Sequence, residues 1–122
     1  MTVLDADTFN DYFNLHTSKY DGSVPGVIMF YQKTCPYCKE FQPIYNDVAD
    51  EKNSRYVLLE YDCRIDGMRT CNDFKVEGTP WVLLFNQGQS WIDTHHFNQY
   101  HLPAGELTVK HFTDWIDSKL VD

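Results

Sequence analysis

Two cysteines separated by two residues, Cys35 and Cys38, stand where an apolar strand is expected to give way to a helix. A cysteine at the start of a helix is a good nucleophile, because free backbone N–H groups and the helix dipole stabilise its thiolate. Pro36 fits the first helical turn, where its missing N–H costs nothing. Cys38 lies one turn later on the same face, within reach of a disulfide with Cys35. The spacing predicts thiol–disulfide exchange, in which Cys35 attacks a partner disulfide and Cys38 resolves the mixed disulfide.

The alternatives for this pair are half of a zinc site, a structural disulfide or a chance spacing. A structural zinc site needs four ligands, and the remaining cysteines, Cys63 and Cys71, fall on separate predicted elements without the C-x-x-C spacing. His95 and His96 are adjacent, so along a strand their side chains point to opposite faces, and His101 falls in a predicted loop. We therefore expect no metal, and no motif indicates a cofactor.

Apolar runs that alternate with helical patterns must position the cysteines. Continuous apolar runs, typical of strands buried on both faces, cover residues 27–31, 56–61 and 81–85. Residues 90–95 are expected to pair back across a turn at 86–89. Helices are expected over residues 36–52, 68–74 and 108–120, the last capped by Thr108.

The N-terminal region is expected to begin with a short extended segment at residues 3–4. A helix capped by Asp5 or Asp7 should follow. Its apolar side would carry Phe9, Tyr12, Phe13 and Leu15 or His16.

The resulting order of elements is β-α-β-α-β-α-β-β-α. Strands that alternate with helices imply crossover connections, and the final tight turn implies an antiparallel pair. The order predicts an α/β fold with a mixed central sheet and helices on both faces. The length of 122 residues suits one domain over residues 1–122. Periodicity alone leaves several α/β folds open.

Composition excludes some classes of function. Lys and Arg number 10 against 18 Asp and Glu, so the formal net charge is -8. That charge argues against a nucleic-acid backbone or an anionic membrane as the main partner. No apolar run approaches the roughly 18 residues of a membrane span. With 43% hydrophobic and 16% aromatic residues, the chain has enough apolar material for a folded core.

Residues 27–45, VIMFYQKTCPYCKEFQPIY, resemble the strand, active site and helix of thioredoxin-fold proteins. The resemblance is closest to the thioredoxin-like domains of the protein disulfide isomerase family. Pro43 matches the proline that kinks this helix in the family. Residues 77–80, EGTP, before an apolar strand resemble the family's cis-proline loop. The resemblance extends over residues 2–120 and implies a thioredoxin fold with four to five strands flanked by helices.

The resemblance also implies where a substrate is bound. Pro80 is expected beside Cys35, with a cis peptide bond that leaves the backbone of Thr79 free to pair with an extended peptide. Trp81 either fills the core or belongs to the rim that contacts substrate. We therefore name Thr79 and Trp81 as predicted substrate contacts. The predicted active-site loop also contains Pro36 and Tyr37.

A second family pattern surrounds the other two cysteines. Residues 62–63 and 71–78 resemble the D-C…C-x-x-F-x-V-x-G pattern of isomerase domains and of the thioredoxin domain of sulfhydryl oxidases. This resemblance implies a structural disulfide between Cys63 and Cys71, with free buried thiols as the alternative. A persistent disulfide requires an oxidising compartment. The expected location is the lumen of the endoplasmic reticulum or the secretory pathway, with the cytoplasm as the alternative.

Four positions depart from the family pattern. Thr34 stands where the family usually has Trp, Met29 replaces the buried acid, Glu60 replaces a basic residue, and the loop at residues 95–101 lacks an arginine. Met cannot transfer protons. We hypothesise that Glu60 is partly buried near Cys38 and acts as its base. The alternative is an exposed carboxylate on the strand, since most Glu residues are exposed.

These observations favour an enzyme, a thiol–disulfide oxidoreductase of the protein disulfide isomerase type that acts on protein thiols and disulfides. Residues 33–38 also resemble a glutaredoxin signature, so a glutathione-dependent reductase is the first alternative, although residues 86–89 lack the Gly-Gly pair of glutaredoxins. The missing acid at Met29 and the missing arginine leave a second alternative. This is a peptide-binding or chaperone module with little turnover.

Overall fold

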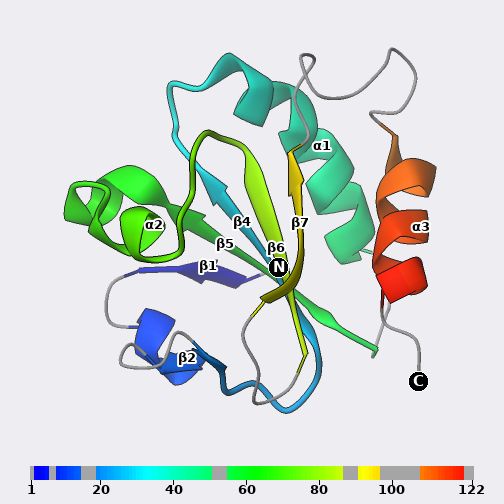
Figure 1. Cartoon of the computed structure of the whole chain (residues 1–122). Coiled ribbons are helices and arrows are strands. Elements are labelled where there is room, and N and C mark those ends of the chain that lie inside the picture. The colour runs from blue at the N-terminus through cyan, green and yellow to red at the C-terminus, as the bar shows by residue number, and fades with distance from the viewer. Residues whose placement is uncertain are drawn as a thin grey trace.

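A five-stranded sheet in the order β1-β5-β4-β6-β7 forms the centre of the computed structural model (Figure 1). The structure describes residues 2–5, 8–14, 19–50, 55–86, 91–96 and 108–119. In sheet order the strands are β1 Thr2–Leu4, β5 Val57–Asp62, β4 Gly26–Tyr31, β6 Trp81–Phe85 and β7 Trp91–His96. The predicted positions of these strands are confirmed to within one or two residues.

The central strand β4 joins the parallel and antiparallel halves of the sheet. It runs parallel to β5, with Met29 beside Glu60, and antiparallel to β6, with Met29 also beside Val82. β6 and β7 are antiparallel, as the tight turn predicted. The central sheet is therefore mixed, and the carboxyl ends of β4 and β5 meet at one edge, where the cysteine motif begins.

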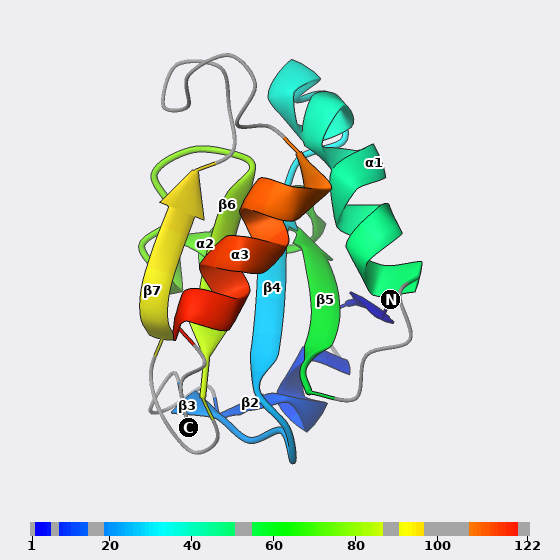
Figure 2. The same ribbon diagram turned by 90° about the vertical axis from the view of Figure 1, so that its right-hand side faces the viewer.

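Helices cover both faces of the sheet. α1 (Pro36–Asp50) and α3 (Val109–Lys119) lie on one face, and α2 (Arg69–Asp73) and a short 3-10 helix, η1 (Thr8–Asp11), lie on the other (Figure 2). The apolar runs are buried on both faces because alternate residues enter different cores. Met29 packs toward α1 and α3, whereas Phe30 packs in the cluster on the α2 side.

The prediction of a helix after Asp5 is correct only for its first turn. Thr8 donates its N–H to the Asp5 carboxylate (2.8 Å), so the cap forms, but only η1 follows. The chain then enters a two-stranded sheet of β2 (Phe13–Asn14) and β3 (Lys19–Tyr20). Phe13 is buried against Phe85, with ring centroids 4.9 Å apart, so tertiary packing overrides the helical periodicity. Asp7, Leu15 and His16 lie outside the described residues.

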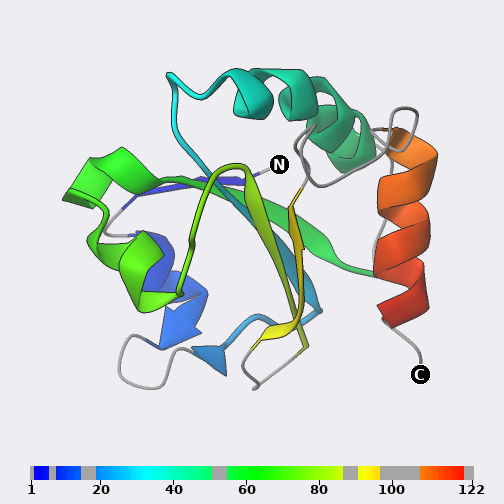
Figure 3. The ribbon, with the colours of Figure 1, turned by 45° about the horizontal axis from the view of Figure 1, so that its top comes forward.

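The other helices agree with expectation at their ends. α1 begins directly after Cys35 and contains Pro43. α3 begins at Val109, directly after Thr108, whose hydroxyl accepts the N–H of His111 (3.1 Å). α2 is preceded by a 3-10 helix that the sequence did not indicate, η2 (Cys63–Asp66). Figure 3 shows α2 and α1 on opposite sides of the sheet. Among the residues described, no helix is long and apolar enough to cross a membrane.

Candidate active site

Cys35 caps the first turn of α1. Its sulfur accepts the backbone N–H of Cys38 (N–Sγ 3.2 Å), and its carbonyl accepts the N–H of Lys39 (3.2 Å). Its own N–H is donated to the carbonyl of Gln32 (3.0 Å), which closes a tight turn before the helix. A sulfur that accepts a backbone N–H at a helix start is placed to carry negative charge. The local geometry is the one that the C-x-x-C spacing predicted.

Cys38 is in a different environment although it lies one turn away. Its side chain is buried, with 3% exposed, whereas Cys35 is only half-buried. Burial, followed by a hydrogen bond with Cys35, raises the pKa of the Cys38 thiol to about 12, and hydrogen bonds with the Gln32 backbone and the Thr79 side chain partly oppose this rise. Both cysteines are free thiols. Cys35 is thus the more accessible of the two thiols, and the raised pKa keeps Cys38 protonated near neutral pH.

Thr79 contacts both sulfurs from across the site. The Cys35 thiol donates to the Thr79 carbonyl (Sγ–O 3.3 Å), and the Thr79 side chain hydrogen-bonds with Cys38. The Thr79–Pro80 peptide bond is cis, and Pro80 is buried. The predicted juxtaposition of the cis-proline loop with Cys35 is therefore present. Pairing of Thr79 with a substrate strand stays a prediction.

The remaining residues of the predicted loop differ in accessibility. Pro36 is exposed and Tyr37 is half-buried. Trp81 begins β6 and belongs to the core cluster on the α2 side, with 9% of its surface exposed. Of the two interpretations of Trp81, this burial favours core filling over a broad contact with substrate.

Glu60 is buried, with 7% exposed, so the exposed-carboxylate alternative is wrong. It lies beside Met29 on the face that α1 covers. Its Oε2 accepts the amide Nε2 of Gln42 (3.0 Å), which also donates to Asn46 (2.8 Å). Gln42 is one helical turn after Cys38, so the carboxylate lies under the same helix as the resolving thiol. A role for Glu60 as its base stays a prediction.

A second buried acid, Asp62, was not singled out from the sequence. It is 6% exposed, and its carboxylate accepts the N–H of Arg64 (2.9 Å) to cap η2. Tyr31 lies beside it in the register, and burial together with Glu60, Asp62 and Cys38 raises the pKa of the Tyr31 phenol. The sequence did carry a signal for Asp62. Side chains alternate along a strand, so residues 60 and 62 lie on the same face, and burial of Glu60 implies burial of Asp62.

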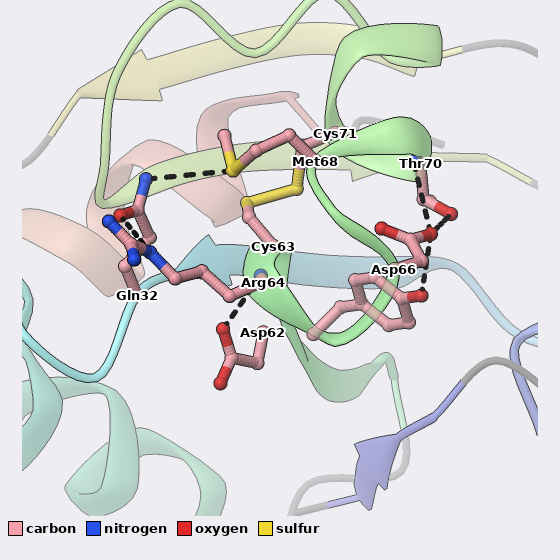
Figure 4. Close-up of a disulfide and its surroundings, with 9 residues drawn as sticks. Gln32, Asp62, Cys63, Arg64, Asp66, Met68, Thr70 and Cys71 are labelled. Atoms are coloured by element: carbon pink, nitrogen blue, oxygen red, sulfur yellow. Dashed lines mark hydrogen bonds between the residues drawn. A yellow bond between two sulfur atoms is a disulfide. The ribbon is translucent and has the colours of Figure 1, made fainter.

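Cys63 and Cys71 form a disulfide across eight positions of sequence, and neither has any exposed surface. The bond joins the start of η2 to the middle of α2 (Figure 4). Within the described part of the chain, no cluster of three or more His, Cys, Asp or Glu could hold a metal ion. The side chains of His95 and His96, and all of His101, lie outside that part.

Comparison with known proteins identifies the family. The thioredoxin family pattern matches residues 3–105. The chain belongs to the thioredoxin family. The predicted fold is therefore confirmed, and a free cysteine pair in this fold is consistent with a thiol–disulfide oxidoreductase.

Individual relatives of this thioredoxin-family chain are distant. A mitochondrial thioredoxin domain-containing protein of Schizosaccharomyces pombe is 33% identical over 61 residues, 49% of this chain and 17% of that protein. A thioredoxin of Mycolicibacterium smegmatis is 29% identical over 73 residues, 59% of this chain and 65% of that protein. Protein disulfide-isomerase A3 of Gallus gallus is 30% identical over 67 residues, 53% of this chain and 13% of that protein. Each match spans less than two thirds of the relative's own length.

Proposed function

We propose that this chain is a thiol–disulfide oxidoreductase of the protein disulfide isomerase type, with Cys35 as nucleophile and Cys38 as resolving thiol. The observation that carries the proposal is the asymmetry of the pair. The Cys35 sulfur is half-buried and accepts a helix N–H, whereas Cys38 is buried and its pKa is raised to about 12. Because of this difference, Cys35 reacts first with the substrate and Cys38 reacts second.

The exchange transfers two electrons without a cofactor. The Cys35 thiolate attacks one sulfur of a substrate disulfide, and the other substrate sulfur leaves as a thiolate that takes up a proton. Cys38 then loses its proton and attacks the Cys35 sulfur. The second substrate thiolate leaves, and a Cys35–Cys38 disulfide forms. The substrate is reduced and the enzyme oxidised; the reverse sequence oxidises a substrate dithiol, and repeated attack without net transfer isomerises disulfides.

The proposed substrates are protein thiols and disulfides in an oxidising compartment. The buried Cys63–Cys71 disulfide supports this location, because such bonds persist in the endoplasmic reticulum and along the secretory pathway. The similarity to protein disulfide-isomerase A3 supports the same class of activity. An extended substrate segment would pair with the backbone of Thr79, which already lies at the Cys35 sulfur.

Two assays test the proposal: reduction of insulin, and refolding of a protein with scrambled disulfides. The wild type should be active in both, and Cys35→Ser should be inactive in both while keeping its circular dichroism spectrum. Refolding of the scrambled protein without glutathione in the buffer, started from the reduced Cys35–Cys38 dithiol form, separates the alternatives. Activity that depends entirely on glutathione would indicate a glutaredoxin-like reductase. A folded wild type without activity would instead indicate a peptide-binding module.

A further inference from the structure

The side chain of Gln32 is held between two residues of the segment that the disulfide closes. Its Nε2 donates to the sulfur of Met68 (3.8 Å), and its Oε1 accepts the Nε of Arg64 (3.1 Å). Both partners belong to residues 63–71, which we call the disulfide loop. Figure 4 shows the Gln32 amide facing the Met68 sulfur and the Arg64 guanidinium, with the Cys63–Cys71 bond beside the Met68 side chain.

The main chain of the same residue serves the cysteine motif. The Gln32 carbonyl accepts the N–H of Cys35 (3.0 Å), and the Gln32 backbone also hydrogen-bonds with the Cys38 thiol. Gln32 directly follows β4, so it is the first residue of the turn that leads into α1. One residue therefore connects the disulfide loop, through its side chain, to the backbone N–H of Cys35 and the thiol of Cys38, through its backbone.

The disulfide loop is shaped so that it presents Met68 and Arg64 together. Met68 has a φ of 75°, a left-handed conformation that is unusual for a residue with a side chain. Its N–H is donated to the carbonyl of Cys63 (2.9 Å), which holds it over the disulfide. Arg64 is fixed at its N–H by Asp62 (2.9 Å). Hydrogen bonds to Cys63 and Asp62 thus fix the disulfide loop. The Gln32 side chain, in contrast, makes its hydrogen bonds with Met68 and Arg64 of the disulfide loop.

We propose that Gln32 is a positioning residue for Cys35, and that the disulfide loop holds it through Arg64 and Met68. This inference rests on the proposed function, because it concerns how readily the Cys35–Cys38 pair exchanges. When the side-chain contacts of Gln32 are lost, the turn before α1 loosens. The Cys35 sulfur then spends less time at the helix N–H that stabilises its thiolate, so it reacts more slowly, and the oxidised pair becomes relatively more stable.

The test compares Gln32→Leu, Arg64→Leu and Met68→Leu with the control Arg69→Leu. Arg69 is an exposed arginine in the same loop, so its substitution removes the same charge without touching the Gln32 contacts. Two quantities are measured: the equilibrium of the Cys35–Cys38 pair with glutathione, and the rate of Cys35 alkylation by iodoacetamide as a function of pH. Each hydrogen bond contributes a factor of about three to ten. The first three variants should therefore stabilise the Cys35–Cys38 disulfide relative to glutathione, and slow the alkylation of Cys35, each by about that factor. Arg69→Leu should change neither quantity.

A fourth variant, Gln32→Glu, keeps an oxygen for Arg64 but loses the donor to Met68, and it should shift the two quantities less than Gln32→Leu does. It also replaces Gln32→Leu if that variant does not fold. Lower thermal stability with an unchanged equilibrium and an unchanged pH profile would overturn the inference, because it would mean a structural role only. The proposed function fails in a different way: the wild type would then not act on insulin, whatever the variants do to alkylation.

Discussion

The two cysteine pairs of this chain differ in their surroundings. Cys35 and Cys38 lie at the N-terminus of α1 as free thiols. Cys35 is half-buried, and its sulfur accepts a backbone N–H. Cys63 and Cys71 have no exposed surface and are joined by a disulfide beneath a short helix. Cys35 of the first pair is accessible to another protein, whereas neither cysteine of the second pair is accessible while the protein is folded.

The difference shows that position in the fold, more than spacing, decides what a cysteine pair does. A thiolate needs donors and access, which a helix start at a sheet edge supplies. A disulfide that must persist needs protection from other thiols, which burial supplies. Gln32 lies between the two pairs and contacts elements of both, so the structural pair also bears on the reactive one.

The largest expected effect comes from removing the second thiol of the reactive pair. In Cys38→Ser, the mixed disulfide between Cys35 and a protein substrate should accumulate, because no thiol remains to displace the substrate. Turnover should fall about a thousand-fold, and the trapped complex should appear on a non-reducing gel. Cys35→Ser is the matched control and should trap nothing. If the two variants behaved the other way round, the assigned roles would be reversed.

Selective alkylation distinguishes Cys35, Cys38 and the disulfide-bonded pair of Cys63 and Cys71. A pKa of about 12 for Cys38 leaves about one thiolate in ten thousand at pH 8. Iodoacetamide at pH 8 should therefore label only Cys35 in the folded protein, as read by peptide mass spectrometry. The Cys38 thiol should begin to react as the pH rises toward its pKa. Unfolding without a reductant should give two labels, on Cys35 and Cys38, and four labels would contradict the disulfide between Cys63 and Cys71.

The structural pair should matter for stability instead. For a bond that closes eight positions of sequence, the double substitution Cys63→Ala, Cys71→Ala should cost about 2.5 kcal/mol of unfolding free energy. For a chain of this length, that corresponds to a fall of about 10 °C in Tm. Calorimetry measures the contrast between this double variant and the matched double variant Cys35→Ala, Cys38→Ala. Both are compared with the wild type in which the Cys35–Cys38 pair is reduced and the Cys63–Cys71 disulfide is intact. Equal Tm values for the two double variants would erase the distinction between the pairs.

The reactive pair was predictable from sequence because its signals are local. The C-x-x-C spacing is a signal between neighbours along the chain, whereas Pro43 and the cis Thr79–Pro80 bond were expected from the resemblance to the family. All appear at the expected places. The N-terminal hairpin was not predictable in this way. Phe9 and Phe13 are spaced as on one helical face, yet their burial is decided by aromatic rings that come much later in the chain.

The burial of Glu60 could be proposed but not decided from the sequence. It depends on the register between β4 and β5, which sets Glu60 beside Met29 under α1, and on the amide of Gln42, which satisfies its carboxylate. The left-handed Met68 and its contact with Gln32 had no local signal at all. Such contacts arise only when separate elements meet.

Among the substitutions expected to affect the chemistry of Cys35 and Cys38, Glu60→Gln should have the smallest effect. This change keeps the size of the side chain and a hydrogen-bond partner for Gln42, but it removes the group that could accept the Cys38 proton. A base in direct contact contributes at least about 100-fold. Because the Glu60 carboxylate hydrogen-bonds with Gln42, one helical turn after Cys38, we expect about tenfold for the Cys38 step. Stopped-flow measurement of release from the mixed disulfide between pH 6 and pH 9 reports this step. Asp62→Asn is the control, since it neutralises the other buried acid on the same face while keeping a cap for η2. A loss of rate in Asp62→Asn but not in Glu60→Gln would move the base from one buried acid to the other.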